Sequence, residues 1–175
     1  MKIKNLILII LFVFCIIAIY FFNAIFKATD TMQNIETYRA RDIAYFAKSG
    51  DAEAQYNLAG CYHQGYGVEQ SYEQAVFWFI KAAEQGHEIA QYRLSICYYD
   101  GLGVEYNGEQ GTYWLMKSAE NGYAEAEYMV GVFYHFGNLG IVDYEQAVFW
   151  YTKAAEQGHE NAVKMLDRIR EQNIK

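Results

Sequence analysis

The sequence YEQAVFWFIKAAEQGHE occupies residues 72–88, and residues 144–160 repeat it with two changes. Tyr151 replaces Phe79, and Thr152 replaces Ile80. Two stretches so similar indicate internal duplication, and self-similarity at a fixed spacing is typical of a repeat protein.

A period of 36 residues extends this duplication over most of the chain. Gly50, Gly86, Gly122 and Gly158 follow one another at that interval. Five further positions keep the same spacing: Ala54, Ala90, Ala126 and Ala162; Tyr56, Tyr92 and Tyr128; Tyr62, Tyr98 and Tyr134; Trp78, Trp114 and Trp150; and Lys81, Lys117 and Lys153. So many coincident positions predict a stack of similar units, because one unit alone cannot bury its apolar face.

Each unit is predicted to contain two helices. The first helix of the first unit is expected from about Ala52 to Gln64, where small and apolar residues recur at helical spacing. Gly65 suits the left-handed position that follows a helix. Ser71 with Gln74 forms a capping box that starts the second helix, and Gly86 ends it. The same arrangement recurs as Asn107 with Gln110 and as Asp143 with Gln146.

The units share the pattern A-x-A-Q-Y-x-L-x-x-x-Y-x-x-G-x-G-V, then a capping residue, then A-x-x-W-x-x-K-A-A-E-Q-G. This pattern resembles the Sel-1-like repeat, a relative of the tetratricopeptide repeat. The second unit departs from it at Gly111 and Ser118, and the third has an altered turn at residues 137–140. The resemblance implies an all-α fold, a right-handed α-α superhelix (solenoid) of helix-turn-helix repeats.

The predicted boundaries follow the period. Three full repeats are expected at residues 51–86, 87–122 and 123–158. A half repeat over residues 38–50 precedes them, and a capping helix over residues 159–175 follows, with the more polar sequence expected of a terminal unit.

The N-terminal sequence predicts a membrane anchor. After a tail at residues 1–5, residues 6–26 are apolar except for Asn23, and at 1.5 Å per residue they span roughly 30 Å, the thickness of a bilayer core. Residues 27–37 would form a juxtamembrane linker. Lys2 and Lys4 favour a cytoplasmic N-terminus, which predicts a single-pass protein of the bacterial inner membrane with a periplasmic repeat domain. A signal peptide that is cleaved to release a secreted domain is the alternative.

The charge of the repeat region restricts its partners. The whole chain has a formal net charge of −7, and from residue 28 onward 11 basic residues oppose 21 acidic ones, which gives −10. Such a domain repels phosphate backbones, so no nucleic acid is expected as a partner. A protein with a basic face fits better.

The sequence predicts neither catalysis nor a metal or cofactor. Equivalent histidines, His63 with His135 and His87 with His159, lie two repeats apart, which places them roughly 20 Å from each other. Zinc ligands must converge within about 2 Å of one ion. The carboxylates have no nucleophile motif, phosphate loop or metal signature beside them, so they are interpreted as a solvated face.

The resemblance to tetratricopeptide repeats implies that the first helix of each unit lines the concave face. The positions there that vary between repeats, with one consensus tyrosine, are the predicted partner-binding residues: His63, Gln64, Tyr92, Ile96, Tyr99, Asp100, Val132, His135 and Phe136. Aromatic residues of this kind dominate interface energetics.

Three functions follow from this resemblance. The first is a membrane-anchored adaptor or regulator that binds another protein through the concave face. The second is an immunity or inhibitor protein that neutralises a secreted toxin enzyme. The third, an enzyme or small-ligand binder acting on cell-wall material, lacks a visible cluster of polar residues to support it.

Overall fold

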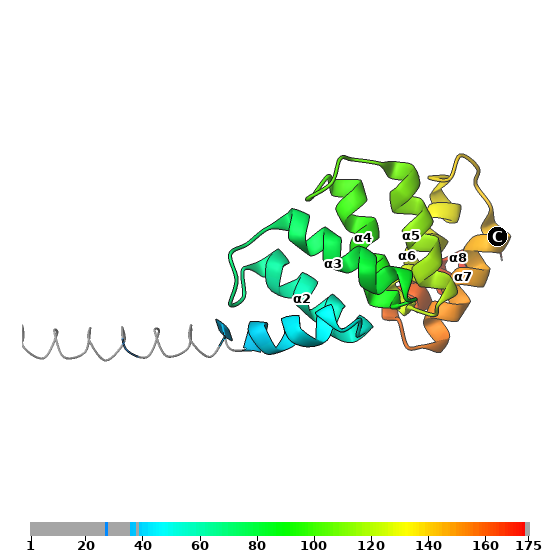
Figure 1. Cartoon of the computed structure of the whole chain (residues 1–175). Helices are drawn as coiled ribbons and strands as arrows, with labels where there is room; N and C mark the ends of the chain where they lie inside the picture. Colours follow the sequence, from blue (N-terminus) through cyan, green and yellow to red (C-terminus); the bar gives the residue numbers. More distant parts are fainter. Residues whose placement is uncertain (1–26, 28–35, 38, 174–175) are drawn as a thin grey trace, which may run out of the picture.

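The computed structural model describes residues 27, 36–37 and 39–173 of the chain. This part is helical and contains no β-strand (Figure 1). The predicted anchor at residues 6–26 lies outside the described residues. A helical segment over residues 39–48 leads into α2 (Ala52–Gln64), α3 (Tyr72–Glu84), α4 (Glu88–Asp100), α5 (Gly108–Glu120), α6 (Ala124–Phe136), α7 (Tyr144–Glu156) and α8 (Glu160–Asn173).

The helix ends follow the predicted capping chemistry. The Ser71 side chain accepts a hydrogen bond from the backbone N–H of Gln74 at 3.2 Å, and Asn107 and Asp143 do the same at the starts of α5 and α7. Gly65 takes a left-handed conformation directly after α2, with φ at +77°. The predicted span of the first helix, about Ala52 to Gln64, is confirmed.

The helices pack as successive hairpins. α2 packs on α3, α4 on α5 and α6 on α7, and each hairpin packs on the next through α3 with α4 and α5 with α6. The chain therefore forms a solenoid, as Figure 1 shows. The right-handed sense of its superhelix stays a prediction.

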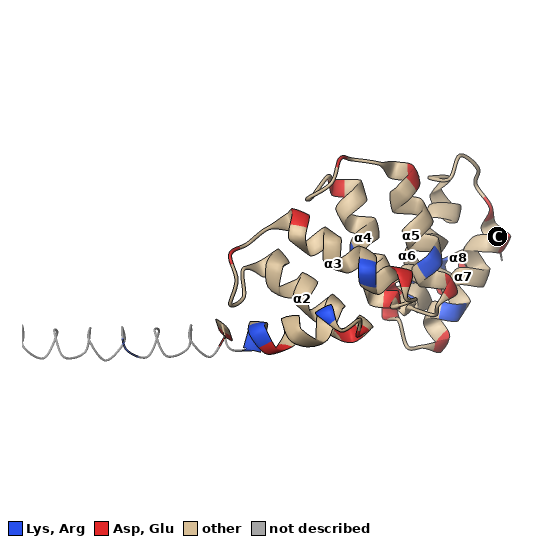
Figure 2. Cartoon of the chain, viewed as in Figure 1, with Lys and Arg blue, Asp and Glu red and all other residues tan. Residues whose placement is uncertain are grey.

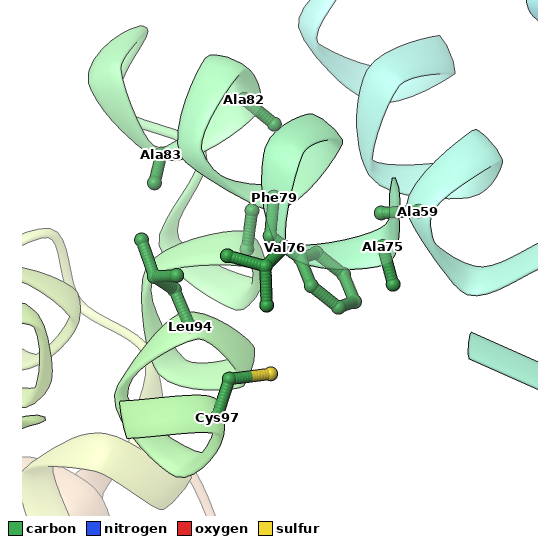
Figure 3. Close-up of a cluster of buried hydrophobic side chains, with 9 residues drawn as sticks. Ala59, Ala75, Val76, Phe79, Ala82, Ala83, Leu94 and Cys97 are labelled. Carbon is green, nitrogen blue, oxygen red and sulfur yellow. The ribbon is translucent and has the colours of Figure 1, made fainter. Parts of the chain in front are cut away.

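Small residues form the closest helix contacts, and larger apolar ones fill the space between them. In the first core cluster Ala59 of α2 and Ala75 of α3 are fully buried, while Phe79 of α3 and Leu94 and Cys97 of α4 are the larger side chains packed beside them (Figure 3). Alanine allows this close approach because its side chain is short. Burial raises the pKa of the Cys97 thiol to about 11, so this cysteine stays neutral and acts as a small apolar residue.

A buried glutamine connects neighbouring repeats at the same position in each. The Gln55 side chain donates to the Ala47 carbonyl at 3.1 Å and accepts from Gln85 at 2.8 Å. Gln91, one repeat later, donates to the Ala83 carbonyl at 3.0 Å and accepts from Asn121 at 2.9 Å. Each glutamine thus connects its helix to the preceding one and to the turn that ends its own repeat.

The third repeat has Glu127 where the others have glutamine. Its side chain is 1% exposed; one oxygen accepts from Gln157 at 2.8 Å, and the other lies 3.3 Å from the Lys153 ammonium. A carboxylate cannot donate to the preceding helix as Gln55 and Gln91 do. Lys153 balances the buried charge in place of that hydrogen bond.

Glycines in the long turns bring adjacent repeats into backbone contact. Gly103 has φ at +72°, and a Cβ atom there would lie 2.3 Å from the backbone of Tyr72 at the start of α3. Gly67 presses in the same way on Glu36. The third turn has Leu139 at this position, where a side chain excludes such close contact, which explains the altered turn of the third repeat.

No helix among the described residues is long and apolar enough to cross a membrane. Acidic and basic residues are interspersed along the repeats (Figure 2).

Candidate functional site

Two neighbouring cavities open along α2. The larger, about 520 Å³, lies between α2 and the segment that precedes it, and the smaller, about 120 Å³, lies between α2 and α4. Tyr56, Gly60 and Gln64 line both cavities. His63, Arg93 and Ile96 complete the part toward α4. These six residues are called the α2–α4 groove below.

The groove exists because Gly60 has no side chain. A Cβ atom built at Gly60 would meet nothing within 4 Å. The equivalent positions in the next two repeats carry the branched side chains of Ile96 and Val132, and Val132 packs on the third core cluster. The first repeat therefore has no side chain at a position where the other two have one.

Arg93 gives the smaller cavity a positive charge. No ion pair is found for it among the described residues, while Tyr56 and Phe79 supply aromatic walls nearby. A guanidinium beside apolar walls suits a carboxylate, which it can bind through two parallel hydrogen bonds. The groove thus combines an apolar lining, one cation and the Gln64 amide.

The predicted binding residues do not form one continuous surface. His63, Gln64 and Ile96 meet in the α2–α4 groove, and the His63 and Tyr72 rings form a T-shaped pair with centroids 5.3 Å apart. Tyr92 packs on Tyr123 at 5.2 Å. The others lie elsewhere: Asp100 is exposed at the end of α4, Val132 packs on the third core cluster, and His135 stacks on Phe136 at 4.6 Å.

Tyr99 has a structural role that the sequence did not reveal. Its hydroxyl lies 2.8 Å from the Thr112 hydroxyl, and its ring covers Gly111 so closely that a Cβ atom there would lie 2.9 Å away. Tyr99 also borders a separate open depression with Phe133 and Asn138. Truncating Tyr99 would therefore disturb the α4–α5 packing and is a poor test of binding alone.

Sequence reasoning missed Arg93. It occupies the position of Asn57 and Met129 in the other repeats, so the variation that singled out Ile96 would also have found it. Arg39 and Glu36, which line the larger cavity, precede the full repeats and have no such periodic signal.

The third repeat contains buried polar atoms that have no partner within the described part of the chain. The Tyr151 hydroxyl, the His135 Nδ1 atom and the Trp150 indole nitrogen are buried without a hydrogen-bond partner. Burial raises the pKa of Tyr151, with a smaller contribution from Tyr128. Trp150 belongs to the second core cluster and Tyr151 to the third. Such atoms reduce stability because their hydrogen bonds to water are lost on folding.

Tyr151→Phe is therefore expected to raise the free energy of unfolding by about 1 kcal/mol, because it removes an unpartnered buried hydroxyl and keeps the ring. Chemical denaturation followed by circular dichroism measures the change. Tyr99→Phe is the matched control: its hydroxyl has a partner in Thr112, so its removal is expected to lower stability. A loss of stability in Tyr151→Phe would show that the hydroxyl is satisfied after all.

Two histidines cap helices and do not gather around a metal site. His87 lies 3.2 Å from Glu53 and its ring packs at a tilt against Tyr56. His159, directly before α8, lies 2.9 Å from Glu125 and stacks on Tyr128. Their Nδ1 atoms accept from the first turns of α4 and α8. Within the part of the chain that the structure describes, no three His, Cys, Asp or Glu side chains are placed to hold a metal ion.

Comparison with known protein families finds the Sel1 repeat three times, at residues 52–87, 89–123 and 124–159. The chain belongs to the Sel1 repeat family. The family's fold is one that serves protein–protein interaction. No curated protein matches the chain significantly.

Two solved Sel1-repeat structures support the fold. The protein c5321, a protective antigen of uropathogenic Escherichia coli strains, is 37% identical with a TM-score of 0.69. The match covers 78% of this chain and 30% of that one. A Sel1 repeat protein from Oxalobacter formigenes is 30% identical with a TM-score of 0.57, over 77% of this chain and 49% of that one. This Sel1-repeat chain thus spans less than half of either relative.

A third match is the immunity protein Pa5087 from Pseudomonas aeruginosa. It is 21% identical with a TM-score of 0.38, over 70% of this chain and 59% of that one. Similarity at this level carries no conclusion about what this chain does.

Proposed function

We propose that this Sel1-repeat protein is a non-catalytic adaptor that captures a segment of a protein partner in the α2–α4 groove. The observation that carries the proposal is the pair of cavities that share Tyr56, Gly60 and Gln64. Together they form an elongated, partly apolar depression along one helix, which suits an extended or helical peptide segment better than a compact ligand.

The charges in the groove specify the segment further. Arg93 in the smaller cavity favours a segment that carries a carboxylate between apolar side chains, whereas Glu36 and Arg39 oppose each other's charge in the larger cavity. The rest of the domain is acidic, so the surfaces around that segment are proposed to be basic. The bound segment of the partner would then be acidic, and the partner's surface around it would be basic.

Gly60→Ile tests the groove, because it introduces the side chain that the second repeat carries at this position. Partner capture is expected to fall at least about tenfold, since a filled pocket excludes an anchoring side chain worth about 1.4 kcal/mol or more. The fold should persist, because the new side chain enters open space. Quantitative mass spectrometry after affinity capture from the source cells measures the loss.

Glu84→Ala is the control variant, since Glu84 is exposed at the end of α3 and lines neither cavity. Arg93→Gln tests the charge of the groove separately from its shape, because it removes the cation and keeps the groove. Proteins captured equally by wild type and Gly60→Ile would contradict a role for the groove.

Tethering is part of the same proposal. The apolar sequence of residues 6–26 supports an anchor that holds the groove close to the membrane, with the repeats on the exported side. A reporter enzyme that is active only outside the cytoplasm, fused after Lys175, is expected to be active. Activity of a cytoplasm-only reporter at the same position would reverse the topology.

A further inference from the structure

An exposed aromatic residue recurs on the second helix of every full repeat. Phe77 of α3 is 47% exposed, Tyr113 of α5 is 50% exposed and Phe149 of α7 is 53% exposed. Each ring meets the next residue, a tryptophan, edge to face, with centroids 5.0 to 5.2 Å apart. The tryptophans are buried or half-buried, so the exposed rings are held on the core and are called the aromatic ladder below.

Each ring of the ladder lies midway between two opposite charges. A glutamate precedes it by four residues and a lysine follows it by four, as Glu73 and Lys81 do around Phe77. The other two sets are Glu109, Tyr113 and Lys117, and Glu145, Phe149 and Lys153. Residues four apart lie on one helix face, about 6 Å apart along the axis. Figure 2 shows the acidic start and the basic later part of α3.

Two of the three lysines lie over the rings. The Lys81 ammonium lies 5.0 Å from the centre of the Phe77 ring, and the Lys153 ammonium lies 5.8 Å from that of Phe149. No ion pair is found for Lys81 among the described residues, and Lys117 pairs only with exposed Glu120. The first two lysines are therefore available to a second surface.

We propose that the aromatic ladder is the contact surface for a second copy of this chain, which binds with its helices antiparallel. A two-fold axis that runs along the ladder brings each ring onto its own equivalent. The same rotation places Glu73 opposite the partner's Lys81, and Glu109 opposite the partner's Lys117. The order glutamate, aromatic, lysine is self-complementary under this rotation, as an isologous interface requires.

The alternative occupants fit the charges less well. Each of the three helices also ends with an exposed glutamate, Glu84, Glu120 or Glu156, so the face carries two carboxylates for each ammonium. An anionic lipid surface would be repelled by this excess and has no cations to offer the glutamates, whereas a second copy supplies a lysine for Glu73 and for Glu109. A parallel arrangement of two copies would place glutamate opposite glutamate and lysine opposite lysine. Only the antiparallel pairing joins the rings and opposes unlike charges.

The size of the face predicts a weak dimer. Three rings, each about half exposed, supply on the order of 300 Å² of aromatic surface, whereas a stable interface buries about 800 Å² per partner. The flanking charges therefore supply orientation and part of the affinity.

Charge-reversal variants of the full-length chain, purified in detergent, test the proposal. Glu73→Lys with Glu109→Lys, and separately Lys81→Glu with Lys117→Glu, should each weaken self-association at least about tenfold, since four intermolecular pairs become repulsive. Mixing the two variants should restore a mixed dimer. Lys153 is left unchanged because it balances buried Glu127. Sedimentation and differential labelling of the two chains report the dimers.

Crosslinking with a short bismaleimide isolates this face from any association through other segments. In a Cys15→Ser, Cys61→Ser background, Tyr113→Cys should crosslink to itself. Glu109→Cys should not crosslink to itself, because the equivalent residue of the second copy lies about 12 Å away along the antiparallel helix. In a mixture, Glu109→Cys should crosslink to Lys117→Cys. The proposal would be overturned if Glu109→Cys crosslinked to itself or if Tyr113→Cys did not. It would also be overturned if a monomer captured anionic vesicles through Tyr113.

Discussion

Gly103→Ala is expected to lower the free energy of unfolding by about 2 to 4 kcal/mol. Gly103 has φ at +72°, a conformation that costs an L-residue about 1 kcal/mol. A Cβ atom would also lie 2.3 Å from the Tyr72 backbone, and forcing extra volume into a tight contact costs about 1 to 3 kcal/mol. The added methyl group would separate the second repeat from the start of α3. Chemical denaturation measures the change.

Gly101→Ala is the matched control two residues away. Gly101 has nearly the same φ, +67°, but a Cβ atom there would come no closer than 3.6 Å to its surroundings. The free energy of unfolding of the control should therefore fall by only about 1 kcal/mol, which is what the left-handed conformation costs an L-residue. Equal losses in the two variants would show that the backbone contact between repeats contributes nothing to stability.

Gly131→Ala is expected to lower the free energy of unfolding by about 1 to 2 kcal/mol. A Cβ atom at Gly131 would lie 2.6 Å from the Tyr151 ring, which is fully buried and has no room to move. Overpacking of this kind costs about 1 to 3 kcal/mol, and the better helix propensity of alanine offsets up to about 1 kcal/mol. The melting temperature should fall accordingly.

Two further variants identify the cause of that loss. Tyr151→Leu in the Gly131→Ala background should recover stability, because the second repeat carries Leu115 at the position of Tyr151 and Ser95 at that of Gly131. Gly60→Ala, another helical glycine but with an open Cβ position, should gain about 1 kcal/mol. Additive effects of Gly131→Ala and Tyr151→Leu would contradict the contact between the two residues.

The helices and their ends were predictable because their determinants are local. Gly65 after α2 and Ser71 before α3 act on residues within one turn, so the sequence alone indicated where each helix begins and ends. The 36-residue period then implied the order of packing. Residues that recur at the same position in each unit must contact equivalent neighbours.

The groove was only partly predictable because it depends on what neighbouring helices fail to fill. Variation between repeats pointed to Gln64 and Ile96, but the sequence does not show that Gly60 leaves a hollow bounded by Arg93. The same limit applies to Tyr99, whose ring covers a glycine in the next helix. A compensating pair such as Gly131 and Tyr151 is likewise visible only when the two helices are packed.

Photocrosslinking tests the central claim, that the α2–α4 groove holds a protein partner, most directly. A photoreactive amino acid placed at Gln64, which lines both cavities, should crosslink in living cells to one protein through a segment that carries a carboxylate. The same residue placed at Glu84 should not crosslink to that protein, and Gly60→Ile should abolish the Gln64 crosslink. A partner that crosslinks from Glu84 as strongly as from Gln64, or a Gln64 crosslink that persists in Gly60→Ile, would contradict the account.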